Sequence, residues 1–260
     1  MYNISVITIC FNNLAELLQT IASVDRQSQA PFEHWIIDGS SNEDIKNYLE
    51  QHPQPAYRKW LVERDKGISD AFNKGVVRAN GEIIVMLNSG DCFFDETTIA
   101  VVTKTFIENP GIDWVHGKYR LQRGNAWVII GKPFDKRKLY RGMRSICHQS
   151  MFLKKKLHDQ FGLYDLSEKI GMDYDFLCRM REAPFSFLPI PLVIFAPAGI
   201  STNSYLKSLK DTKRIYQKYF GKSLKMWLWQ IRLKVLYYLL RSPVGNFLYK
   251  IKTLLKLENM

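Results

Sequence analysis

Acidic, amide and hydroxyl side chains follow three apolar runs within the first 91 residues. The first run reaches Thr8 and leads to Asn12, the second stops at Asp38, and the third is followed by Ser89 and Asp91. If these runs are parallel strands of one sheet, their carboxyl ends meet at the same edge. Acids and amides gathered there suit a ligand that carries hydroxyl groups, a base and metal-bound phosphates.

Two of these clusters have a simpler interpretation when each is taken alone. Asp38 opens an Asp-Gly-Ser sequence, which is common in turns. The segment from Asn88 to Asp91 could equally be a loop that caps a helix. The joint placement of the clusters at the ends of apolar runs favours a shared site over separate turns.

The apolar runs alternate with helical patterns over residues 1–115. We expect strands at residues 4–9, 34–37, 60–63 and 83–87, and helices at residues 14–27, 44–52 and 68–78. This alternation predicts an α/β fold in which a mostly parallel sheet carries helices on both faces. Ligands of such sheets bind beyond the carboxyl ends of the strands, where the polar clusters lie.

The pattern is less regular after residue 115. We expect a hairpin of strands at 117–121 and 126–130, a basic stretch at 136–144, a strand at 149–153, a helix at 173–182 and a strand at 188–195. We place a domain boundary after residue 204. Residues 205–260 then form a basic tail of two or three helices, with a break near Pro243.

Six segments, taken in order, resemble family 2 glycosyltransferases of the GT-A fold, and in particular bacterial enzymes that build O-antigen or other surface polysaccharides. The matching segments are residues 6–13, 36–40, 63–75, 81–91, 147–150 and 171–175. The resemblance implies an enzyme that moves a sugar from a nucleoside diphosphate of the uridine type to a saccharide acceptor. It further implies a lipid-linked acceptor and inversion at the anomeric carbon.

The resemblance also implies which side chains hold the donor. Thr8 and Asp38 would contact the nucleoside, with Asp38 reading the base. The nucleotide pocket would be completed by Asn12, Asp65, Asp70, Asn73 and Ser89. Asp70 and Asn73 are three residues apart, so one face of a helix can present both, although capping of that helix is the alternative.

Asp91 matches the residue that binds a divalent cation, Mg²⁺ or Mn²⁺, in this family. A departing nucleoside diphosphate develops negative charge, and a hard cation on its phosphates neutralises that charge. Many relatives carry an acidic pair at the last two positions of this segment. This chain has Gly90 before Asp91, and Asn88 where many have aspartate. One carboxylate together with phosphates and waters can still hold such a cation.

Asp173 matches the general base of the family, which takes the proton of the acceptor hydroxyl in an inverting transfer. Asp175 lies two residues further along the predicted helix and therefore points elsewhere, where it can pair with Arg179. The family has an acidic residue directly before the base, and this chain has Met172 there.

His148 and Gln149 match the acceptor side of the family's site. His148 could bind a phosphate or a hydroxyl, or it could be a structural histidine beneath the site. Four basic residues could meet an acceptor diphosphate or form a solvated run of charge: Arg137, Lys138, Arg141 and Arg144.

The net charge of +12 is concentrated in the tail. Residues 205–260 hold 13 Lys and Arg against 2 Asp and Glu, whereas residues 1–204 hold 24 against 23. A uniformly basic face that binds nucleic acid is therefore disfavoured, and a tail that meets an anionic surface is favoured.

The cellular location is predicted from three further features. The four cysteines have no spacing typical of a metal or redox site, no signal peptide is recognisable, and prolines interrupt the longest uncharged run, residues 183–206. We expect reduced thiols and no membrane-spanning segment. The predicted location is cytoplasmic, peripheral on the cytoplasmic face of the membrane.

Residues 224–240 project onto a helix that is apolar on two sides. One stripe contains Leu224, Trp227, Leu228, Ile231, Val235, Tyr238 and Leu239, and the other contains Met226, Trp229, Leu233, Leu236, Tyr237 and Leu240. Such a helix needs two partners, of which one can be the main domain and the other a membrane interface or another subunit. Residues 247–257 suit in-plane binding to anionic lipid, or a bundle that completes the fold.

Two other functions compete with transfer. A catalytically silent nucleotide-sugar-binding or scaffold protein would fit the departures at Gly90 and Met172, whereas Asp91 and Asp173 argue against it. A nucleotidyltransferase on a similar sheet would need a Gly-rich phosphate loop after the first strand, and the sequence lacks one.

Overall fold

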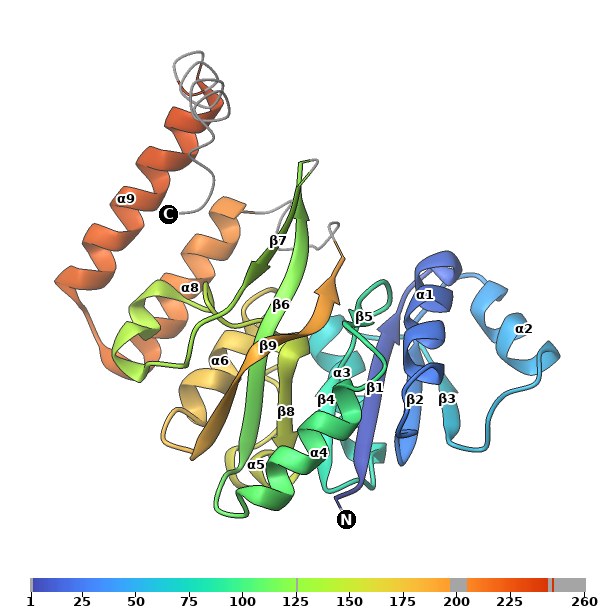
Figure 1. Ribbon diagram of the computed structural model, residues 1–260. Helices are drawn as coiled ribbons and strands as arrows, with labels where there is room; N and C mark the ends of the chain where they lie inside the picture. Colours follow the sequence, from blue (N-terminus) through green and yellow to red (C-terminus); the bar gives the residue numbers. More distant parts are fainter. Residues whose placement is uncertain (1, 125, 197–204, 243–244, 246–260) are drawn as a thin grey trace.

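The computed structural model describes residues 2–124, 126–196, 205–242 and 245, in which nine strands form one sheet (Figure 1). The strands are β1 (Ile4–Cys10), β2 (Glu33–Asp38), β3 (Arg58–Val62), β4 (Ile83–Met86), β5 (Cys92–Phe93), β6 (Trp114–Arg123), β7 (Ala126–Ile130), β8 (Met151–Lys154) and β9 (Phe185–Phe195). The α-helices are α1 (Leu14–Asp25), α2 (Asp44–Gln51), α3 (Ile68–Arg78), α4 (Thr98–Glu108), α5 (Lys156–Phe161), α6 (Met172–Arg179), α8 (Tyr205–Phe220) and α9 (Leu224–Arg241). Two short 3₁₀ helices are η1 (Lys136–Arg141) and η2 (His148–Ser150).

The strand order is β3-β2-β1-β4-β8-β6-β9-β5, with β7 paired to β6. The four strands β3, β2, β1 and β4 run parallel, while β8 runs antiparallel to both β4 and β6. The chain adds β2 and β3 on one side of β1 and then places β4 on the other side. The winding therefore reverses between β1 and β4, and open α/β sheets bind their ligands at such a switch point.

Helices cover both faces of the sheet because the parallel strands are apolar on both sides. On one face, Ile7 of β1 packs in a cluster with Phe72 of α3 and Phe176 of α6. On the other face, the neighbouring Val6 packs in a cluster with Phe106 of α4. This arrangement confirms the predicted α/β class with a mostly parallel sheet.

Close contact between α3 and the sheet depends on a glycine. A Cβ atom on Gly75 would lie 2.3 Å from the Cγ2 atom of Ile7, so a larger residue would push the helix away from β1. Because α3 carries Asp70 and Asn73, this packing fixes their height above the sheet.

The predicted elements before residue 88 all form, with shifts of a few residues at their ends. The predicted hairpin also forms, and Tyr119 pairs with Ile130 in its register. Two α-helices are missing from the prediction: α4, whose Ile99, Val102 and Phe106 are fully buried, and the short α5. The short strand β5 and the 3₁₀ helices η1 and η2 were not predicted either. The predicted helical pattern at 247–257 lies outside the described residues.

The first C-terminal helix, α8, is tied to the rest of the molecule by charge. Arg214 forms a pair of hydrogen bonds with the buried Glu168, and Lys218 bonds to Asp175 of α6 at 3.0 Å. Ile215 of α8 is completely buried between these contacts. Helix α8 thus packs as part of the globule, and the predicted boundary after residue 204 stays a prediction.

Helix α9 has one covered and one open apolar side. Met226 and Leu233 are buried, as predicted for the side that meets the main domain. Leu236 and Leu240, predicted on the same side, are exposed, so the cover extends over only the first half of the helix. The opposite stripe is exposed along its whole length, from Leu224 through Trp227 and Ile231 to Leu239. Within the described residues, no helix is long and apolar enough to span a bilayer.

Candidate active site

The polar clusters that follow the strands do meet at one edge of the sheet. Cys10, the last residue of β1, lies opposite Asp38, the last residue of β2. On the other side of β1, the backbone N–H of Ser89 donates to the Ile9 carbonyl at 3.2 Å, which carries the ladder beyond β4. Asp38 and the turn that contains Asp91 therefore flank the carboxyl end of β1 at the switch point.

The position predicted for Thr8 is wrong. Strand β1 continues past it to Cys10, so Thr8 lies inside the strand and not at its end. Its side chain is completely buried, and its hydroxyl pairs with Nε2 of His34 at 2.9 Å. Because this hydroxyl is already paired inside the sheet, whereas Oδ2 of Asp38 has no partner among the described residues, we leave Thr8 out of the proposed nucleotide site.

Asp38 is fully buried, but only one of its two carboxylate oxygens has a hydrogen-bond partner among the described residues. Its Oδ1 accepts a hydrogen bond from the backbone N–H of Ser40 at 2.9 Å. Its Oδ2 is buried without a hydrogen-bond partner in the described parts of the chain. A buried carboxylate oxygen without a partner is costly, and a donor group of a ligand would remove that cost.

Asn12 holds the loop after Asp38 in place. Its amide oxygen accepts from the backbone N–H of Ser41 at 2.9 Å, and its amide nitrogen donates to the Ser41 hydroxyl at 2.8 Å. Its backbone adopts φ 53°, a left-handed conformation that asparagine tolerates better than most residues. Asn12 therefore shapes the site by orienting the 38–42 loop against β1.

Asp65 and Asp70 share one lysine that the sequence prediction did not single out. Lys74 lies 2.8 Å from Asp65 and 3.4 Å from Asp70. The backbone N–H of Lys66 chiefly lowers the pKa of Asp70, whereas burial raises the pKa of Asp65. A Cβ atom on Gly39 would meet the Asp65 carboxylate at 2.1 Å, so glycine lets Asp65 lie directly beside the Asp38 loop.

Asn73 is engaged in the fold. Its amide nitrogen donates to the Tyr164 carbonyl at 2.8 Å, and its amide oxygen accepts from the Tyr164 N–H at 2.9 Å. These two bonds fasten α3 to the loop after α5. The predicted contact of Asn73 with a nucleotide stays a prediction.

Asp91 is buried in the turn after β4. Its Oδ1 accepts the backbone N–H of Ala196 at 2.8 Å, from a residue 105 positions later. Burial raises the pKa of Asp91 to about 7, against the hydrogen bonds from Ala196 and the Gln149 side chain, which lower it. Gly90 precedes it with φ 96°, a conformation that favours glycine.

Two further oxygen atoms in this turn are buried without partners among the described residues: Oδ1 of Asn88 and Oγ of Ser89. Together with the Asp91 carboxylate they offer hard oxygen donors, the kind that Mg²⁺ and Mn²⁺ prefer. The types of the residues present therefore fit a divalent cation.

Asp173 lies in the first turn of α6 and is half-buried. Its Oδ1 accepts the N–H of Tyr174 at 2.7 Å, and burial raises the pKa of Asp173 to about 6. The buried thiol of Cys147 has its pKa raised by burial and by the charges of both Asp91 and Asp173. Cys147 is thus close enough to both carboxylates for their charges to raise its pKa, and the prediction did not single it out.

Asp175 is not available for chemistry, as predicted from its place on the helix. It is buried and binds Arg179 at 3.0 Å, which confirms the predicted pair. It also binds Lys218 at 3.0 Å and the Tyr219 hydroxyl at 2.7 Å. Its role is to anchor α8 to α6.

His148 and Gln149 do not form an open acceptor surface. His148 is buried, its Nε2 pairs with the Tyr164 hydroxyl at 2.8 Å, and burial lowers its pKa to about 3. A neutral buried imidazole brings no charge to a phosphate, which favours the structural alternative for His148, and its contact with an acceptor stays a prediction. Gln149 is also buried and accepts from the Cys147 thiol at 2.9 Å, so it supports Asp91 from beneath.

A second group of acidic side chains has the spacing of a metal site, but each of these side chains is paired with an arginine or lysine of the protein. Asp165, Glu168 and Asp175 bring oxygens within 4.8 Å of one another, the one such group in the described ranges. Each carboxylate is paired with Lys218, Arg214 or Arg179. We therefore assign this group to the packing of α8 and not to metal binding.

Comparison with known proteins agrees with this geometry. The sequence profile of the family described as glycosyl transferase family 2 matches residues 5–162. An uncharacterized glycosyltransferase of Mycobacterium tuberculosis is 34% identical over 179 residues, which cover 68% of each chain. A PGL/p-HBAD biosynthesis glycosyltransferase of Mycobacterium bovis is 29% identical over 184 residues, covering 69% of this chain and 70% of the relative.

Two solved structures share the fold at low sequence identity. The fragment S. aureus TarS 1-349 in complex with UDP superposes with a TM-score of 0.60 at 16% identity, covering 86% of this chain and 68% of that fragment. The mannosyltransferase PcManGT from Pyrobaculum calidifontis, in complex with GDP-Man and Mn²⁺, gives a TM-score of 0.65 at 15% identity. Here the match covers 97% of this chain and 80% of that one.

Proposed function

The chain belongs to glycosyl transferase family 2, and on this premise we propose that it moves a sugar from a uridine diphosphate sugar to a lipid-linked saccharide, with inversion and with the help of a divalent cation. The observation that carries the proposal is a pair of carboxylates without a cationic partner among the described residues: Asp91 in the turn after β4 and Asp173 in the first turn of α6. Burial raises the pKa of both, and both influence the pKa of Cys147. The first suits a leaving diphosphate and the second an attacking hydroxyl. Such an enzyme would serve surface polysaccharide synthesis.

Asp38 supports the choice of uracil as the base. Its Oδ2 is the one carboxylate oxygen there that lacks a partner among the described residues. Uracil presents a single N–H on its pairing edge, and one free carboxylate oxygen matches one donor. Asp65, held beside the Asp38 loop by Lys74, extends this acidic surface toward the ribose hydroxyls.

A divalent cation would be held by the Asp91 carboxylate, with Asn88 and Ser89 as supporting oxygen donors. Once bound, the cation neutralises charge on the departing diphosphate. Asp91 must be ionised to bind it, and its raised pKa makes cation and proton compete for the same carboxylate. The Ala196 N–H and Gln149 keep Asp91 oriented toward the sheet edge.

Asp173 would act as the general base. The residue is partly exposed, unlike Asp175, and its pKa of about 6 leaves it ionised at neutral pH yet basic enough to take a proton. As the acceptor hydroxyl attacks the anomeric carbon, its proton passes to Asp173 and the bond to the phosphate breaks on the opposite face. One displacement of this kind inverts the configuration.

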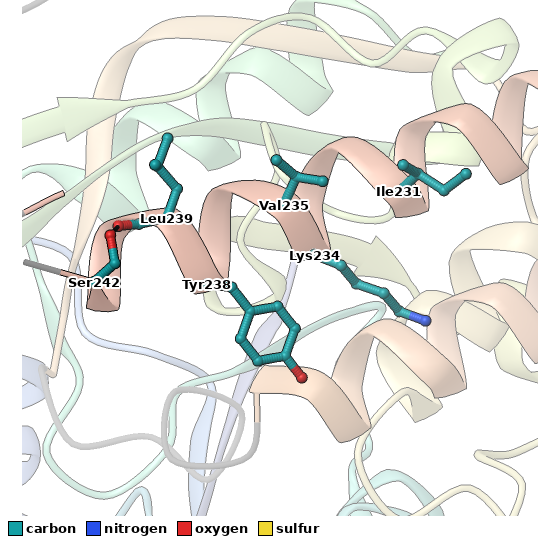
Figure 2. A pocket seen from close by; sticks show the side chains of 6 residues that line it. All are labelled: Ile231, Lys234, Val235, Tyr238, Leu239 and Ser242. Carbon is teal, nitrogen blue, oxygen red and sulfur yellow. Dashed lines mark hydrogen bonds between the residues drawn. The ribbon is translucent and has the colours of Figure 1, made fainter. Parts of the chain in front are cut away.

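The C-terminal helices support a membrane-bound acceptor. The open side of α9 carries a shallow groove of about 530 Å³, lined by Ile231, Lys234, Val235, Tyr238, Leu239 and Ser242. Figure 2 shows Ile231, Val235 and Leu239 in line along the helix, with Lys234 and Tyr238 on an adjacent side. An exposed apolar stripe bordered by lysines suits a helix that lies in the plane of an anionic membrane surface.

The direct test is turnover with a panel of nucleotide sugars, Mn²⁺ and a lipid-linked saccharide preparation. We expect one uridine diphosphate sugar to be consumed, and NMR of the product to show the anomeric configuration opposite to that of the donor. Retention of configuration would contradict the single displacement at Asp173. Binding of a donor without any transfer would favour the silent nucleotide-sugar-binding alternative.

A further inference from the structure

Three arginines surround one indole ring where α9 meets η1. The guanidinium carbons of Arg141, Arg144 and Arg232 lie 4.5, 5.5 and 5.3 Å from the ring centroid of Trp229. We refer to these three side chains as the arginine cluster. Arg141 ends η1, Arg144 follows it, and Arg232 comes from α9, so the cluster forms only when the helix packs against the main domain.

The arginine cluster has no carboxylate partner in the described residues, unlike the basic residues just before it. Arg137 and Lys138 pair with Asp135, the residue before η1, at 2.9 and 3.2 Å, so both already have a carboxylate partner in the protein. In contrast, Nε of Arg141 is buried without a partner among the residues described. Arg144 donates only to a neutral group, the Tyr205 hydroxyl at 2.9 Å.

Three guanidinium groups around one ring, without a carboxylate partner in the described residues, leave an excess of positive charge that a bound anion would neutralise. Guanidinium groups bind phosphate oxygens through parallel N–H bonds, and the Trp229 ring holds their planes through cation–π contact. A diphosphate, with two charged groups a few ångströms apart, matches an array that is spread around an indole ring.

The cluster is linked to the neighbourhood of the two proposed catalytic carboxylates through η1 and the segment that follows it. Arg144 precedes Cys147 by three residues, so their Cα atoms are at most about 11 Å apart. The carbonyl of Leu139 in η1 accepts the hydroxyl of Tyr174, the residue after Asp173. The open apolar side of α9, on the same helix as Arg232, begins directly beside the cluster.

We propose that Arg141, Arg144 and Arg232, arranged around Trp229, form a phosphate-binding site that holds the diphosphate of the lipid-linked acceptor. The proposal rests on the proposed function, because it places the acceptor saccharide toward Asp173 and the lipid toward the open side of α9. A phospholipid headgroup offers the same phosphate chemistry, but it has no reason to bind next to the catalytic base.

The test uses farnesyl diphosphate as the probe, with the full-length protein in EDTA so that no cation supports binding at Asp91. Isothermal titration calorimetry should show binding that weakens about tenfold for Arg144→Gln, the loss expected for one charge-assisted contact. The triple variant R141Q/R144Q/R232Q should bind too weakly to measure. Farnesol, which lacks the phosphates, should not bind to the site.

The matched control removes three charges outside the cluster and outside the open side of α9, with Lys210, Lys213 and Lys222 each changed to Gln. These lysines are exposed, and the control should bind farnesyl diphosphate as the wild type does. Equal loss in the control and the arginine variant would overturn the site and leave only general charge attraction. Unchanged binding in the singly substituted, well-folded Arg144→Gln variant would overturn it as well.

A second measurement separates the two sources of phosphate. Sedimentation with vesicles of phosphatidylglycerol and phosphatidylcholine should respond no more to the arginine variant than to the lysine control. Loss of vesicle binding with retained farnesyl diphosphate binding would assign the arginines to phospholipid headgroups instead. Failure of the proposed function is distinguishable, because it would appear as absent turnover while the probe still binds through the arginines.

Discussion

Two sets of buried or half-buried carboxylates occur in this protein, and they differ in what surrounds them. Asp91 and Asp173 have no cationic side chain as a partner in the described chain, and burial raises the pKa of both. Asp165, Glu168 and Asp175 are each paired with an arginine or lysine. Both sets consist of acidic side chains, so the difference between them is the missing protein cation. We infer that the unpaired carboxylates of the first set are the ones available to a ligand. Asp173 and Asp175 make this contrast within one turn of α6.

The largest effect that would sharpen this comparison is expected from Asp91→Asn. Transfer should fall by about 10³-fold and Mn²⁺ affinity should be lost, because the neutral amide cannot replace an ionised ligand. The folded protein without cation should gain stability above pH 7. The raised pKa means that ionisation of Asp91 opposes folding progressively from its ordinary value of 3.8 up to about 7. Kinetics and denaturant unfolding at pH 8 would check both; reduced stability would break the comparison.

The mirror experiment is Asp175→Asn. Three groups, Arg179, Lys218 and Tyr219, would lose the charge they bind. We expect the free energy of unfolding to drop by about 3 kcal/mol, as for other buried ion pairs that lose one partner. Turnover per folded molecule should change little at a temperature well below the melting midpoint. A large fall in turnover with normal stability would place Asp175 in the active site.

The pH dependence of transfer should report the two unpaired carboxylates separately. With saturating Mn²⁺ and donor, activity should fall about tenfold per pH unit below about 6, because only ionised Asp173 accepts a proton. With limiting Mn²⁺ the fall should begin at about 7, where protons start to displace the cation from Asp91. If the pH at which activity is half-maximal does not change with the Mn²⁺ concentration, the assignment of Asp91 is contradicted.

The smallest predicted effect concerns Thr8, which the sequence placed in the nucleotide site and the structure places in the core. Thr8→Val should lower the free energy of unfolding by about 1 kcal/mol through loss of the hydrogen bond to His34. The KM for the donor should stay within twofold of the wild-type value. A KM that rises tenfold would restore Thr8 to the nucleotide site.

The sequence predicted the N-terminal half of the sheet well because strand and helix patterns there agree with burial. It misplaced the end of β1 because that end is set by pairing with Asp38 of β2, a partner 28 residues away. It missed α4, whose Thr98, Ile99, Val102 and Thr103 are β-branched and favour strands locally. Packing against the sheet overrides that preference.

The acceptor side was harder to predict than the donor side. Asp91 and Asp173 could be found from their place in matched segments, whereas the burial of His148 depends on Tyr164, and the support of Asp91 depends on Ala196. Such contacts join distant parts of the chain and leave no local pattern. The arginine cluster is of the same kind, since Arg232 and Trp229 meet Arg141 only after α9 packs on η1.

The most direct test of the central claim, that unpaired Asp173 is the base, is transfer and donor binding measured side by side in Asp173→Asn. Asp159→Asn, an exposed acid on α5, serves as the control and should behave as the wild type. We predict that Asp173→Asn lowers the rate of transfer by about 10³-fold while the dissociation constant of the donor stays within about twofold. Loss of donor binding, or transfer at a near-normal rate, would contradict the assignment.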